Sequence, residues 1–196
     1  MLVLVRHGQS ELNAAGRLSG RIDAPLTDLG LAQAKAVAAA LAEVGEPAAV
    51  ISSPLQRARE TAAAIGLPVV VDERWIEIDY GPYDGWLLGD VPPEMWAAWR
   101  QDPSYAPPGG ESLAALGGRV RQACEELLAD AERRVVVVSH VSPIKAAVAW
   151  ALGVGDEVAW RMFLAPASLT TIGQGAAGPS LHSFNVTAHL EGVATG

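Results

Sequence analysis

Two histidines in this sequence directly follow short apolar runs that have the composition of buried strands. His7 comes after Leu2–Arg6, and His140 comes after Val135–Ser139. In open α/β sheets, ligands bind at the carboxyl ends of the strands, near the point where the strand order reverses. If both runs are parallel strands of one sheet, the two imidazoles therefore face the same crevice.

Arginines accompany these histidines. Arg6 precedes His7, and Arg57 lies in the first turns of a helix expected after a third strand, Ala49–Ser52. A guanidinium donates in a planar fork that matches the oxygens of a phosphoryl group, so the cluster predicts a site for a dianionic phosphate. Histidine also binds metals, but these arginines would repel a cation and no carboxylate stands at ligand spacing. We therefore expect no metal.

Strands and helices alternate along the chain, and several strands are continuously apolar. This pattern predicts a three-layer α/β fold with a mostly parallel central sheet covered by helices on both faces. Residues 81–110, rich in Gly, Pro and Trp, interrupt the alternation; we expect a small cap-like insertion in a single domain over residues 1–196. The expected strands are Leu2–Arg6, Ala49–Ser52, Val69–Val71, Val135–Ser139, 168–172 and 181–186, and the expected helices are 27–44, 54–65, 113–127 and 143–152.

Composition limits the possible classes of protein. The 196 residues carry a net charge of −8, half of them are hydrophobic, and Cys124 is the single cysteine. Disorder is disfavoured by the apolar fraction, and one cysteine cannot form an internal disulfide, which fits a reducing compartment. The acidic balance argues against binding to nucleic acid or an anionic membrane. No apolar run is long enough to span a bilayer, so we expect a soluble, cytoplasmic monomer or homodimer.

The segment LVRHGQSELN resembles the signature of the histidine phosphatase superfamily, in its phosphoglycerate mutase-like branch 1. The family's pattern is a strand, then Arg-His-Gly, then Thr or Ser and Asn at fixed offsets. Further blocks follow in the family's order, so that the resemblance covers about residues 2–152. These blocks are GRLSGRIDAPLTDLGLAQA, SSPLQRARETA, DERWIEIDYGPYDGW, PPGGES and VVVVSHVSPIKA.

The resemblance implies roles for individual residues. His7 would be the nucleophile that becomes phosphohistidine, and Arg6, Arg57 and His140 would complete the phosphate pocket. Glu77 matches the family's proton donor, with Asp79 and Asp84 as alternatives. Further candidates for substrate contact are Gln9, Ser10, Asn13, Gly20, Arg21 and Val141; for Arg21, a solvated surface position is the alternative. His182 and His189 are expected to be surface or structural residues.

The chemistry of phosphoryl transfer agrees with such a site. The transition state is loose and carries charge on its equatorial oxygens, so positioned cations stabilise it. Neutral His7 attacks in line, while the arginines, and His140 if protonated, hold the transferring group. Glu77 then protonates the leaving alkoxide and later deprotonates the attacking water. No cofactor is expected, because the arginines take the place of a metal ion.

Two features bear on which reaction is carried out. Val141 stands where the family commonly has glycine after the second histidine. Cofactor-dependent mutases carry extra segments that close over a bisphosphorylated ligand, whereas this chain is short, which favours hydrolysis of small phosphomonoesters. The alternative is a phosphoglycerate mutase that uses 2,3-bisphosphoglycerate. A non-catalytic phosphate-binding domain is a third possibility, but it would need neither a nucleophile nor an acid.

Overall fold

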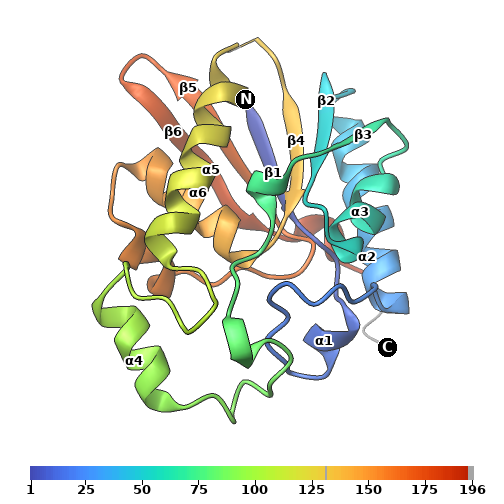
Figure 1. Ribbon diagram of the computed structural model, residues 1–196. Coiled ribbons are helices and arrows are strands. Elements are labelled where there is room, and N and C mark those ends of the chain that lie inside the picture. The colour runs from blue at the N-terminus through green and yellow to red at the C-terminus, as the bar shows by residue number, and fades with distance from the viewer. Residues whose placement is uncertain (131, 194–196) are drawn as a thin grey trace.

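The computed structural model describes residues 1–130 and 132–193, and a six-stranded sheet lies at its centre (Figure 1). The strand order is β3-β2-β4-β1-β5-β6, in which β3, β2, β4 and β1 run parallel to one another. β5 and β6 are antiparallel additions on the far side of β1. The strands are β1 (Leu2–Arg6), β2 (Ala49–Ser52), β3 (Val69–Val71), β4 (Val135–Ser139), β5 (Leu169–Gly175) and β6 (Gly178–Val186).

The predicted three-layer α/β fold with a mostly parallel sheet is confirmed. β5 runs antiparallel to β1, and β6 pairs antiparallel to β5 because only two residues join Gly175 to Gly178, and so short a connection makes a hairpin. Both strands also extend beyond the predicted ranges, since the polar and glycine positions beside the turn still pair.

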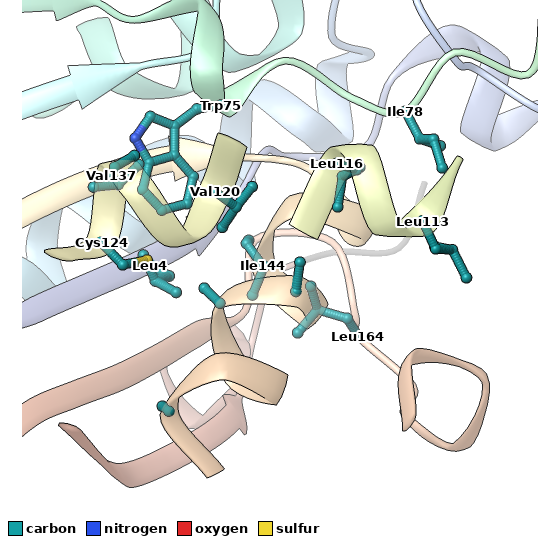
Figure 2. Packing of buried hydrophobic residues seen from close by; sticks show 14 of the residues in the cluster. Leu4, Trp75, Ile78, Leu113, Leu116, Val120, Cys124, Val137, Ile144 and Leu164 are labelled. Carbon is teal, nitrogen blue, oxygen red and sulfur yellow. The ribbon is translucent and has the colours of Figure 1, made fainter. Parts of the chain in front are cut away.

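Helices cover both faces of the sheet, and the strand sequences require this. Val3 and Val5 pack toward α2 (Asp28–Glu43) and α3 (Gln56–Ala63), in a cluster with residues of both helices. The alternate residues of β1, Leu2 and Leu4, belong to the opposite cluster, which includes α5 (Leu113–Leu128) and α6 (Val141–Leu152). Figure 2 shows part of this second cluster, with Trp75, Val120 and Ile144 close together. Cys124 lies in it as a buried side chain.

Local chemistry sets where the helices begin. Thr27 caps α2 by accepting a hydrogen bond from the backbone N–H of Gly30. α3 begins two residues later than predicted, because Ser53 still donates its backbone N–H to Val138 and so extends the strand. α6 begins two residues earlier than predicted, at Val141. Pro143 is accommodated in its first turn, where a missing N–H leaves no bond unmade.

Two helices were not predicted from the sequence. α1 (Glu11–Ala14) is a single turn closed by a capping box between Ser10 and Asn13. α4 (Pro93–Gln101) lies within residues 81–110, whose buried Met95 and Trp99 join the cluster of α5 and α6. The remaining helical turns are η1 (Glu73–Trp75), η2 (Gly81–Tyr83), η3 (Asp156–Arg161) and η4 (Ala188–Leu190). Among the described residues, no helix combines the length and the apolar character needed to cross a membrane.

Candidate active site

The carboxyl ends of three neighbouring parallel strands bring together the residues that the sequence singled out. Arg6 pairs with Ser139 across β1 and β4, and the residues that follow them are His7 and His140. The two imidazole rings lie with their centroids 5.0 Å apart, and both side chains are buried. Ser53 follows the third strand, β2, on the other side of β4. The predicted juxtaposition of the two histidines is therefore present.

The hydrogen bonds of His7 define its tautomer. Nδ1 lies 2.6 Å from the backbone oxygen of Gly8, and a carbonyl only accepts, so Nδ1 carries the proton. Nε2 accepts a hydrogen bond of 3.3 Å from Nε of Arg57. Burial, followed by the charges of Arg57 and Arg6, holds the pKa of His7 well below its usual value. His7 is therefore neutral, with the lone pair on Nε2.

The guanidinium of Arg57 is fully buried and fixed by backbone oxygens. Nη1 donates to Ile22 at 2.7 Å and Nη2 donates to Gly20 at 2.8 Å, while Nε faces His7. Gly20 has φ of +43°, and a Cβ there would lie 1.7 Å from a carboxylate oxygen of Asp84, so only glycine fits. The Gly20 loop and Arg57 thus hold each other in place.

Arg6 supplies a second cation, which is half-buried. Its Nη1 donates to the backbone oxygen of Leu164 at 2.5 Å, and its Nε has no hydrogen-bond partner among the described residues. Burial is the main effect that lowers the pKa of Arg6 to about 10, which still leaves the side chain charged at neutral pH. A cavity of about 190 Å³ collects these groups. Its lining consists of Arg6, His7, Asn13, Arg17, Leu18, Ser19, Gly20, Arg57, Glu77, Tyr80, Leu88 and Val141.

His140 lies beside His7 but does not belong to the lining of this cavity. Its Nε2 lies 2.6 Å from Oγ of Ser53, and its Nδ1 is buried without a partner among the described residues. Burial, then Arg57, His7 and Arg6, place the pKa of His140 well below its usual value. In the ligand-free protein His140 is therefore neutral at pH 7, because two arginines already occupy its surroundings.

Of the three candidate proton donors, Glu77 alone lines the cavity. Its Oε1 accepts from the backbone N–H groups of Ile78 at 2.8 Å and Ser142 at 3.2 Å. Asp79 instead lies 3.5 Å from Arg21 as an ion pair, and Asp84 accepts from the backbone of Arg21. The two aspartates thus serve the neighbouring loop.

The predicted substrate-contact residues divide into two groups. Asn13, Gly20 and Val141 line the cavity, whereas Gln9, Ser10 and Arg21 do not. The side chain of Gln9 accepts from Thr27, Ser10 caps α1, and Arg21 pairs with Asp79 and Glu111. These three side chains hold loops in place and are not part of the cavity lining. The position of a residue in the sequence does not reveal the direction of its side chain.

Several lining residues were missed in the sequence. Arg17 and Leu88 are exposed residues at the rim, and Leu18 and Ser19 lie in the same loop as Gly20. Tyr80 stands three residues after Glu77 and packs edge-on against Trp99 at 5.2 Å between ring centroids. Its aromatic type within the Glu77 block is the only sequence signal that marks it. His182 and His189 bond locally, to Ser180 and to the backbone of Ala167.

The fold and the site together define an α/β protein with a buried pocket of histidines and arginines at the carboxyl edge of its sheet. The sequence matches the model of the histidine phosphatase superfamily (branch 1) over residues 2–187. The chain therefore belongs to this superfamily, as its motifs predict.

Named relatives are similar over most of the chain. A Mycobacterium tuberculosis protein named Bifunctional protein Rv2228c is 43% identical over 177 residues, which are 86% of this chain and 49% of the relative. The chain thus spans about half the length of the mycobacterial relatives that it matches at this level. Phosphoserine phosphatase 1 of Hydrogenobacter thermophilus is 38% identical over 96% of this chain and 93% of its own. A solved structure of a mycobacterial glucosyl-3-phosphoglycerate phosphatase with VO3 has a TM-score of 0.85 at 33% identity, covering 95% and 98% of the two chains.

Proposed function

We propose that this protein hydrolyses small phosphomonoesters through a phosphohistidine formed on Nε2 of His7, without a metal ion or other cofactor. The observation that carries the proposal is the state of His7. The imidazole is neutral, its proton on Nδ1 is bonded to Gly8, and its Nε2 lone pair faces Nε of the buried Arg57. A neutral imidazole nitrogen beside a cation can act as a nucleophile toward an anionic phosphoryl group that the cation binds.

The first step moves the phosphoryl group to the protein. Nε2 of His7 attacks phosphorus while the bond to the ester oxygen breaks, and a protonated Glu77 gives its proton to the departing oxygen. The imidazole then becomes cationic, and its Nδ1–H donates to Gly8 across the 2.6 Å contact. Arg6 and Arg57 hold the charge on the equatorial oxygens. The neutral His140 beside His7 keeps one ring N–H, which can donate to a phosphoryl oxygen once an anion is bound.

The second step hydrolyses the phosphohistidine and restores the free enzyme. Glu77, now ionised, removes a proton from a water molecule, which attacks phosphorus and breaks the bond to Nε2. Inorganic phosphate leaves and His7 regains its lone pair. Glu77 is the acid in one direction and the base in the other, and its place in the cavity lining supports both roles.

Hydrolysis is favoured over the mutase alternative. Relatives that this chain covers almost completely are named phosphatases, among them the Hydrogenobacter phosphoserine phosphatase. Phosphoserine and glucosyl-3-phosphoglycerate are phosphomonoesters of small alcohols, and we extend that substrate class to this chain. We expect no formation of 2-phosphoglycerate from 3-phosphoglycerate when 2,3-bisphosphoglycerate is added.

Trapping of the intermediate tests the proposal. The protein, in EDTA, is mixed with p-nitrophenyl phosphate and quenched in alkali, and phosphohistidine is located by mass spectrometry. We expect turnover and a label on His7, and the loss of both in His7→Ala. His182→Ala, which removes an exposed histidine remote from the cavity, is the matched control and should label like the wild type. Turnover that persists in His7→Ala, or that stops in EDTA, would refute this mechanism.

A further inference from the structure

A second and smaller cavity adjoins the candidate active site. Its volume is about 70 Å³, and it shares Tyr80 and Val141 with the larger cavity. Glu77 lines the larger cavity and the next residue, Ile78, lines the smaller one. The smaller cavity therefore lies on the proton-donor side, where the alcohol part of a substrate must leave. Its lining consists of Ile78, Tyr80, Trp99, Leu113, Val141, Ser142, Lys145, Ala159 and Trp160.

Lys145 is the single charged residue of this lining. It is half-buried, and within residues 1–130 and 132–193 it has neither an ion pair nor a hydrogen bond. Burial and the nearby charge of Arg6 both lower the pKa of Lys145, and Glu77 opposes them from a distance too long for an ion pair. Lysines rarely lie in such apolar surroundings without a partner.

The position of Lys145 in its helix adds to this unfavourable balance. Lys145 is the fifth residue of α6, near the helix end that carries partial positive charge. An uncharged residue of similar length would avoid both the burial of a charge and the repulsion by Arg6. The described part of the protein offers no partner to this lysine, whereas a negative ligand in the cavity would supply one.

The rest of the wall favours an acceptor as the ligand. Trp99 and Trp160 each have a buried indole N–H with no partner among the described residues, and an indole N–H can only donate. The lining contains one cationic side chain and no carboxylate.

We propose that this cavity is a subsite in which Lys145 binds a carboxylate carried by the alcohol part of the substrate. The proposal rests on the proposed function and narrows its substrate class to phosphomonoesters of hydroxy acids. A single lysine matches one negative charge, whereas the dianionic phosphoryl group has two arginines of its own.

Two substrates that differ only in the carboxylate give a direct test. O-phosphoserine and O-phosphoethanolamine are compared on the wild type, Lys145→Met and Lys145→Arg. We expect the wild type to favour phosphoserine, and the ratio of the two kcat/KM values to fall at least tenfold in Lys145→Met. Lys145→Arg should keep most of the ratio. Lys35→Met, which removes an exposed lysine on α2, is the control and should keep all of it.

The possible outcomes separate this proposal from the proposed function. An equal loss on both esters would mean that Lys145 acts through Glu77 or the fold, and would overturn the subsite, as would an unaltered ratio. If the wild type cleaves no phosphomonoester and His7 takes no label, the proposed function fails by itself. Calorimetry can then measure the binding of the same two esters to the wild type and to Lys145→Met. The subsite is supported if the wild type prefers phosphoserine and Lys145→Met does not, and it is refuted otherwise.

Discussion

At the scale of single residues, the site depends on a guanidinium that does three things at once. Arg57 donates to the backbone oxygens of Gly20 and Ile22, and its Nε meets Nε2 of His7. The fork fixes the loop that forms one wall of the cavity and keeps a positive charge against His7, the proposed nucleophile. A lysine ammonium would keep the positive charge but could not donate in all three of these directions.

Arg57→Lys should therefore lose most activity in spite of its conserved charge. We expect kcat/KM on p-nitrophenyl phosphate to fall at least about 100-fold, in line with the cost of removing one positioned charge-stabilising donor. Arg59→Lys supplies the control, because Arg59 lies two residues away in the same helix and is exposed. Thermal unfolding of both variants shows whether the fold has survived. A loss of less than about threefold in a folded Arg57→Lys would show that the fork is dispensable.

At the scale of elements, a loop ahead of α5 supports the backbone of the proposed proton donor. Glu111 bonds Arg119 at 2.8 Å through each of its oxygens and also Arg21 at 3.2 Å. Both arginines donate in turn to the backbone oxygen of Glu77, at 3.3 Å from Arg21 and 3.5 Å from Arg119. None of these bonds joins Glu111 to a residue that lines the cavity. Glu111 therefore acts on Glu77 indirectly, by holding the two guanidiniums.

Glu111→Gln should consequently impair the reactions that need a proton most. A p-nitrophenolate leaves with little help from an acid, whereas an alkoxide requires one. We expect kcat to fall about tenfold or more on an alkyl phosphate and much less on p-nitrophenyl phosphate. Glu126→Gln, which alters a more exposed carboxylate paired with Arg74, should affect neither ester. A uniform loss on both esters would assign Glu111 a purely structural role.

Some elements of the fold and the site could be predicted from the sequence, and others could not. β1 and β4 are continuous apolar runs that can only be buried strands, so His7 and His140 were placed correctly. α4 was missed because Pro, Gly and Trp mask its short period, although Trp99 of this helix does line a cavity. Gln9 stands beside the catalytic block but bonds to Thr27 instead. Chain position fixes where a backbone runs, whereas side-chain direction depends on partners from distant segments.

At the scale of the whole molecule, two neutral buried histidines link stability to pH. In the unfolded chain both imidazoles titrate near their usual pKa, while in the native protein both pKa values are well below it. Below about pH 6.5 the unfolded state therefore binds more protons than the native state. The stability that these groups contribute is present above that pH and is lost as the pH falls.

The free energy of unfolding should accordingly decrease on acidification by about 1.4 kcal/mol per pH unit for each histidine, at most. Urea titrations between pH 7 and pH 5 measure this slope. His7→Asn and His140→Asn should each remove about half of it. The raised pKa values of Asp84 and Asp156 have the opposite effect on stability, chiefly at lower pH. The urea titrations therefore stop at pH 5. An equal slope in the wild type and both variants would contradict the proposed linkage.

The 5.0 Å separation of the two imidazoles has a consequence for how such a protein can diversify. It is close to the spacing of about 4.8 Å between adjacent strands, because each ring follows one of two paired strands. The backbone ladder thus sets the geometry of the phosphate-binding half. The proposed leaving-group half is lined by Ile78, Tyr80 and side chains of α4, α5, α6 and η3. Substitutions there can exchange one alcohol for another while the phosphate-binding geometry, held by the sheet, is inherited intact.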